Sequence, residues 1–172
     1  NVTISGSVDS DSGKPAAGTI SVSIPTALQF QVDSKGNVKG GSIDVVNNGL
    51  DGVQIVADQF IDDAPNGSIK VNNPTVFDKS TNRSEKKRSD VVLWIQGNGE
   101  RAYFNPEGEH GICNEEGTPA NDIVVSTLSK RDGGSNSDKI RLNGYAGTAN
   151  IEGENALTDQ FTLRLKVKKV TQ

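Results

Sequence analysis

Apolar and polar residues alternate along much of this chain in short runs, and each run ends at residues that favour turns. The alternation is clear at 19–24 (TISVSI), 28–32 (LQFQV) and 161–167 (FTLRLKV). A period of two places apolar side chains on one face of a strand, whereas a helix needs a period of 3.6. Turn sequences such as 33–37 (DSKGN) separate the runs. The sequence therefore predicts an all-β fold, an antiparallel β-sandwich of jelly-roll or immunoglobulin-like topology with long loops.

The length of 172 residues suits one domain with a single core. Residues 1–8 (NVTISGSV) alternate like a strand, and the residues up to 18 (DSDSGKPAAG) have the composition of a flexible connector. We therefore divide the chain into an N-terminal strand with its connector, 1–18, and a single sandwich domain, 19–172. Within that domain, the Gly-, Pro- and Glu-rich stretch 97–121 is expected to be a long insertion, and the charged stretch 78–90 an exposed loop.

Composition also bears on location. The chain begins with Asn1 and contains no methionine, so we interpret residue 1 as a processed end left by signal-peptide cleavage. This predicts a secreted, extracellular or cell-surface protein. The net charge of −4 and the pI near 5.0 disfavour binding to nucleic acid through phosphate contacts. No apolar run approaches the roughly 18 residues of a membrane-spanning helix, so no membrane span is expected.

Residue patterns that support catalysis are missing. His110, the single histidine, lies three residues before Cys113 in a stretch rich in glutamate. Neighbouring loop residues rarely hold a nucleophile and its base in a fixed geometry. The sequence contains no G-x-S-x-G elbow, no P-loop and no dinucleotide-binding fingerprint. We therefore expect no enzymatic activity and assign no catalytic residue.

Calcium is the candidate ion, because aspartates cluster in two places. Asp58, Asp62 and Asp63 lie close together in the sequence, and Asp9 and Asp11 alternate with serines. Hard oxygen ligands of this kind suit Ca²⁺. The alternative is that these aspartates form turns and caps. No other cofactor is predicted.

The cysteine and the aromatic residues leave alternatives open. Cys113 is the only cysteine, so its thiol is buried, free, or joined to another molecule by an intermolecular disulfide. Trp94 and Phe161 lie in alternating runs, which predicts core positions. Tyr103 and Phe104 lie within 97–121, where they either form an exposed ligand-binding pair or pack the loop onto the sandwich.

Residues 21–59 resemble a module of secreted and cell-surface proteins of Firmicutes. The matching features are Ile24-Pro25-Thr26 at the end of a strand, the D-x-x-G-N turn at 33–37, and Asn47-Asn48 at the end of another strand. The module is similar in style to the TasA/camelysin and WxL-type surface or fibre-subunit proteins. The resemblance implies a β-sandwich that is exported and located at the cell surface. The matching motifs are of the kind that form turns and strand ends, and none of them is catalytic.

Two functions of different class follow. The first is a structural subunit of an extracellular bacterial fibre, pilus or appendage, a homopolymer assembled by donor-strand exchange. Its donor strand would carry Val2, Ile4 and Val8, and the alternative is that this strand pairs within its own sandwich. The second function is a monomeric surface adhesin or carbohydrate-binding sandwich that uses the loop 97–121. The sequence names no host or surface ligand.

Overall fold

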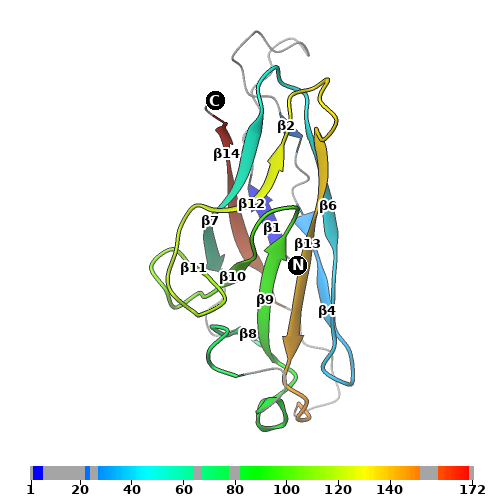
Figure 1. Cartoon of the computed structure of the whole chain (residues 1–172). Helices are drawn as coiled ribbons and strands as arrows, with labels where there is room; N and C mark the ends of the chain where they lie inside the picture. Colours follow the sequence, from blue (N-terminus) through cyan, green and yellow to red (C-terminus); the bar gives the residue numbers. More distant parts are fainter. Residues whose placement is uncertain are drawn as a thin grey trace.

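The computed structural model describes residues 2–5, 22–23, 27–63, 67–77, 82–151 and 159–170 (Figure 1). Within these ranges the chain forms strands and one short 3-10 helix, η1 (Arg83–Glu85). The strands are β1 (Val2–Ser5), β2 (Val22–Ser23), β3 (Ala27–Leu28), β4 (Phe30–Val32), β5 (Val38–Gly40), β6 (Ser42–Asn47), β7 (Val53–Asp62), β8 (Lys70–Val71), β9 (Asp90–Gln96), β10 (Ala102–Phe104), β11 (Ile112–Cys113), β12 (Ile123–Leu128), β13 (Ser137–Ala146) and β14 (Phe161–Lys169).

Two sheets pack face to face, which confirms the predicted β-sandwich. Sheet A has the strand order β12-β7-β14-β1-β3, and sheet B has the order β11-β10-β9-β13-β6-β2, with β8 paired to β9. The strands β4 and β5 form a separate hairpin. The chain passes between the sheets repeatedly, since β6 and β13 belong to sheet B and β7 and β14 to sheet A. All pairings in the two large sheets are antiparallel except β1 with β14 and β8 with β9.

The alternating run 161–167 fills the core as predicted. In β14, Phe161, Leu163 and Leu165 are buried, while Arg164 and Lys166 between them are exposed. This separation of faces is the period-two pattern read from the sequence. The core is therefore built from one face of each sheet.

Aromatic rings join the two sheets. Phe60 of β7 stacks on Phe104 of β10 with ring centroids 4.1 Å apart, and on Phe161 of β14 with centroids 5.5 Å apart. Burial of these rings contributes the largest apolar areas of the core. Phe161 of the run 161–167 and Phe104 of 97–121 thus belong to one aromatic cluster around Phe60.

The prediction that 97–121 is a long insertion loop is wrong in its central part. Ala102, Tyr103 and Phe104 form β10, which pairs with β9, and Cys113 of β11 pairs in turn with Tyr103. All three residues of β10 are buried. The sequence shows no alternation here because both faces of β10 are covered, so no position needs to be polar.

The turn at 33–37 forms as predicted. The Asp33 carboxylate accepts hydrogen bonds from the backbone N–H groups of Lys35 (2.8 Å) and Asn37 (2.9 Å). These bonds to the charged form hold the pKa of Asp33 below its ordinary value. Gly36 adopts a φ of +78°, which glycine tolerates without strain. Gly40 is also required, because a Cβ there would lie 1.6 Å from the backbone oxygen of Leu142.

The expected exposed loop 78–90 is described from residue 82 onward, and this part packs against the sandwich. Arg83 is half-buried, and its Nε donates a hydrogen bond to the backbone oxygen of Ala146 (2.6 Å). The backbone N–H of Arg88 donates to the oxygen of Ala149 (3.0 Å). Charge alone does not predict this docking, because the Arg83 side chain binds a backbone carbonyl that becomes available only in the folded chain.

Candidate functional site

The N-terminal strand lies inside sheet A of its own chain. β1 pairs parallel with β14, in a register that sets Val2 opposite Phe161 and Ile4 opposite Leu163. On its other side β1 pairs antiparallel with β3, and Val2 lies opposite Leu28. Since these three partners are buried, β1 completes the sheet at the level of the core. We call the space between β14 and β3 the β1 slot.

Of the predicted donor residues, the structure places Val2 and Ile4 in the β1 slot, whereas Val8 lies outside the described residues. The described residues of β1 pair with the first half of β14, as far as Ser5 opposite Arg164. β7 pairs with β14 along its whole length, from Phe161 to Lys169. Among the described residues, no strand pairs with the second half of β14 on the side of β1.

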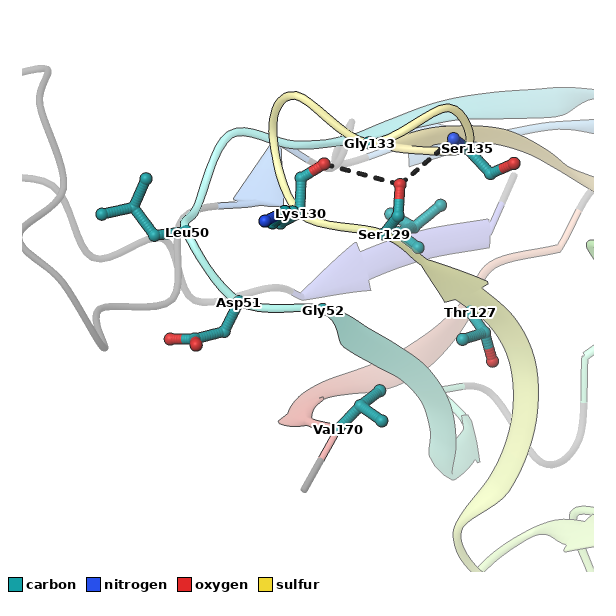
Figure 2. Close-up of a pocket in the computed structure, with 10 residues that line it drawn as sticks. Leu50, Asp51, Gly52, Thr127, Ser129, Lys130, Gly133, Ser135 and Val170 are labelled. Atoms are coloured by element: carbon teal, nitrogen blue, oxygen red, sulfur yellow. Dashed lines mark hydrogen bonds between the residues drawn. The ribbon is translucent and has the colours of Figure 1, made fainter. Parts of the chain in front are cut away.

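An open pocket of about 760 Å³ lies at the end of the sandwich where β14 finishes (Figure 2). Its walls come from the β6–β7 turn, the end of β12, the β12–β13 loop and the residue after β14. They are Leu50, Asp51, Gly52, Thr127, Leu128, Ser129, Lys130, Gly133, Ser135 and Val170. Leu50 and Val170 are two of the four large apolar residues that the described part of the chain exposes. A strand running parallel to β14 points toward this pocket.

Asn47 holds the two loops of the pocket together. Its side chain is fully buried, and its Nδ2 donates to the backbone oxygens of Asp51 and Ser129, each at 2.8 Å. Its Oδ1 accepts from the backbone N–H of Gly49 (2.9 Å). Asn47 is the first residue of the Asn47-Asn48 motif on which the family resemblance partly rests. In this chain its side chain joins the β6–β7 turn to the β12–β13 loop. The exposed Asn48 takes no part in these contacts.

The structure does not gather the predicted calcium ligands. Asp58 is nearly buried on β7, and its Oδ1 pairs with Lys166 Nζ at 2.8 Å. Asp62 lies four residues further along the same strand, about 13 Å away at the usual rise of a strand. The Asp63 carboxylate accepts a hydrogen bond from Thr162 Oγ1 (2.7 Å). Within the described ranges no three His, Cys, Asp or Glu side chains lie close enough to hold a metal ion. Asp9 and Asp11 lie outside those ranges.

A small ion-pair network covers the outer face of sheet A beside Asp58. Lys168 Nζ contacts Asp122 Oδ2 at 2.7 Å, and Lys166 Nζ lies 3.9 Å from Asp122 Oδ1. The hydrogen bond from Lys168 lowers the pKa of Asp122, and the bond to Asp58 raises the pKa of Lys166. Asp122 has a φ of +61°, rare for a residue with a side chain. Asp122 Oδ2 and Asp58 Oδ1 each have a lysine partner within this network, whereas Asp122 Oδ1 is buried without a hydrogen-bond partner among the described residues.

Cys113 is free and fully buried. It lies on the outer side of sheet B in a second cluster with Phe77, Val92 and Tyr103, against which Trp94 packs. Burial raises the pKa of the thiol to about 11. An intermolecular disulfide needs an exposed sulfur, and the folded chain does not present one at Cys113. His110, by contrast, is exposed, three residues away in sequence and outside this cluster.

The exposed aromatic pair expected for the adhesin function does not exist. Tyr103 is 4% exposed and Phe104 is fully buried, so these rings pack the segment onto the sandwich. Trp94 differs from the expectation in the other direction, since it is only half-buried. The Arg101 guanidinium lies over its ring, 4.8 Å from the centroid. Sequence reasoning missed this arginine because the pairing of β9 with β10 is what brings the two residues together.

Comparison with protein-family models, with curated proteins and with solved structures finds no match to this chain. Among the described residues, no helix has the length and apolar character that crossing a membrane requires.

Proposed function

We propose that this chain is a structural subunit of an extracellular bacterial fibre, pilus or appendage, and that identical subunits assemble by donor-strand exchange. In this proposal, β1 of one copy enters the β1 slot of the next copy, where it pairs with β14 and β3. Backbone hydrogen bonds supply affinity, and the side-chain positions along the slot supply register. Such a contact is head-to-tail and repeats without closing, so it builds a filament.

The position of β1 carries the proposal. β1 lies inside sheet A, between β14 and β3, although it contributes only four residues. Without it, β14 becomes an open edge of sheet A, and β3 has no other partner among the strands that the structure describes in that sheet. Phe161 and Leu163, which lie opposite β1 in the register, are fully buried, so we expect the core to lose stability when the slot is empty. That strand can belong to the same chain or to a neighbour, because the contacts are the same.

The second half of β14 would also match a strand longer than the described β1. If the register of β1 continues, residues 6 and 8 of an exchanged strand lie opposite Leu165 and Val167. Leu165 is buried and Val167 packs on the core. The predicted donor residue Val8 then falls in the same row as Val2 and Ile4. In the row formed by residues 2, 4, 6 and 8, the three apolar side chains Val2, Ile4 and Val8 match the apolar face of β14, and residue 6 is a glycine.

A disulfide lock tests the exchange directly. Ser5 and Arg164 are register partners, and neighbouring strands lie about 4.8 Å apart, within the range that a disulfide bridges. With Cys113→Ala as background, the double variant Ser5→Cys/Arg164→Cys should form an internal disulfide as a monomer. This lock should prevent filaments in electron microscopy, and reduction should restore them. The matched control is Asp44→Cys/Lys139→Cys, a register pair in sheet B, which should assemble normally.

Mixing the two single variants, Ser5→Cys and Arg164→Cys, should give disulfide-linked dimers once filaments have formed. Removal of residues 1–9 should abolish filaments. The proposal fails if the full chain and the shortened chain both stay monomeric in light scattering and the shortened chain is merely less stable, as expected for loss of a core strand. It also fails if the locked variant assembles as well as the control.

A further inference from the structure

A basic surface lies on the outer face of sheet B. Trp94 and Gln96 of β9 point away from the core, since Leu93 and Ile95 beside them are buried in it. Gln96 lies opposite Arg141 of β13 in the register, and on its other side it meets Arg101, which precedes β10. We call Trp94, Gln96, Arg101 and Arg141 the arginine surface.

Arg101 is held in a fixed orientation. Its Nε donates to Gln96 Oε1 (3.1 Å), its Nη1 donates to the Tyr103 hydroxyl (3.3 Å), and its guanidinium plane lies over Trp94. These contacts leave the remaining N–H groups of the five on a guanidinium without a partner among the described residues. The side chain is exposed and forms no ion pair with any residue that the structure describes. Binding of a ligand to this guanidinium would therefore cost little further side-chain conformational entropy.

Arg141 provides a second cation in the same row. It is exposed and forms no ion pair with a described residue, whereas the neighbouring Lys139 is neutralised by Asp44 at 2.9 Å. Gln96 on β9 lies between the two arginines, with Arg141 of β13 on one side and Arg101, the residue before β10, on the other. Two strand spacings set the Cα atoms of the arginines about 10 Å apart. Two arginines without an ion-pair partner among the described residues thus lie on the same face of sheet B, on either side of Gln96, in a chain whose net charge is −4.

We propose that the arginine surface binds the carboxylates of a linear polyuronate, an acidic polysaccharide. The planar fork of a guanidinium matches a carboxylate in two parallel hydrogen bonds. Because carboxylates recur along a polyuronate, both arginines bind one molecule, and the second contact is intramolecular. The exposed Asn143, opposite Trp94 in the register, adds an amide for sugar hydroxyls. Nucleic acid fits less well, since its denser negative charge meets a protein of net charge −4. This inference is independent of strand exchange.

Calorimetric titration of the full chain with alginate tests the inference, with neutral dextran as the control polymer. Arg101→Gln and Arg141→Gln should each weaken alginate binding about tenfold or more, as expected for loss of a charge-assisted hydrogen bond. The matched control Arg131→Gln changes an exposed arginine in the β12–β13 loop and should alter affinity less than twofold. Arg101→Lys should fall between the wild type and Arg101→Gln, because it keeps the charge and loses the fork. Unchanged melting temperatures would assign these losses to binding.

Four results would overturn the inference: no binding of alginate, equal binding of dextran, equal affinity of the Arg101→Gln and wild-type chains, or an equal loss in Arg131→Gln. Tighter binding of polyglutamate or of single-stranded DNA, with the same dependence on Arg101 and Arg141, would also overturn it. The surface would then serve an acidic protein or a nucleic acid instead of a glycan.

Discussion

Replacing Asn47 by alanine should destabilise the whole sandwich, although Asn47 lies at the end of a strand beside a surface pocket. The substitution removes three hydrogen bonds, to the backbone of Gly49, Asp51 and Ser129. Each such bond contributes about 1 kcal/mol net, and the backbone groups left behind are at least partly buried. We expect the free energy of unfolding to fall by about 2–4 kcal/mol. For a chain of 172 residues this corresponds to a drop of roughly 6–12 °C in melting temperature.

The assay is urea unfolding followed by the fluorescence of Trp94, with the slope m checked for constancy. Asn48→Ala is the matched control, because Asn48 is the exposed neighbour in the same motif, and its effect should stay within about 0.5 kcal/mol. Asn47→Asp tests the donors separately, since it keeps an acceptor for Gly49 but turns carboxylate oxygen toward two carbonyls. Asn47→Asp should lower the free energy of unfolding by at least as much as Asn47→Ala does. A loss in Asn47→Ala no larger than in Asn48→Ala would refute the role assigned to this side chain.

Two further predictions concern the segment that the sequence presented as an insertion. Phe104→Ala should cost about 3–5 kcal/mol in urea unfolding, because the ring is fully buried and stacked on Phe60, and a cost below about 1 kcal/mol would mean that the segment is a surface loop. Stability should also fall as the pH rises from about 9 to about 11, because folded Cys113 keeps its proton until about 11 while the unfolded thiol releases it near 9. The contribution is about 3 kcal/mol, and Cys113→Ala should lose correspondingly less over this interval; identical pH profiles would contradict the buried thiol.

Period-two alternation was enough to predict the fold class and many of the strands. It succeeded at β14, where one face meets the core and the other meets solvent, and at the turn 33–37, where Asp33 and Gly36 meet local backbone requirements. It failed at β10, because a strand covered on both faces has no polar positions to reveal it. It also gave no sign that Arg83 would bind backbone carbonyls of a distant segment.

The candidate sites divide in the same way. The sequence predicted a strand over residues 1–8, which the structure confirms for Val2–Ser5, but the partners of this strand, β14 and β3, are fixed only when distant segments form sheet A. The aspartates near Asp58 looked like calcium ligands because they are close in sequence, whereas the extended β7 separates them and Lys166 takes the charge of Asp58. Arg101 and Arg141 are 40 positions apart in the numbering and become neighbours of Gln96 only through strand pairing.

The sequence by itself therefore determined local properties: which segments are extended, where turns fall, and that one domain with a single core can form. These depend on interactions between residues close in the chain and on the burial of one face of a strand. Tertiary structure alone decided the rest: the parallel register of β1 with β14, the burial of Tyr103, Phe104 and Cys113, and the exposure of the arginine surface. Each of these depends on contacts between segments far apart in the sequence, and the alternation of apolar and polar residues along one segment does not indicate which distant segment it contacts.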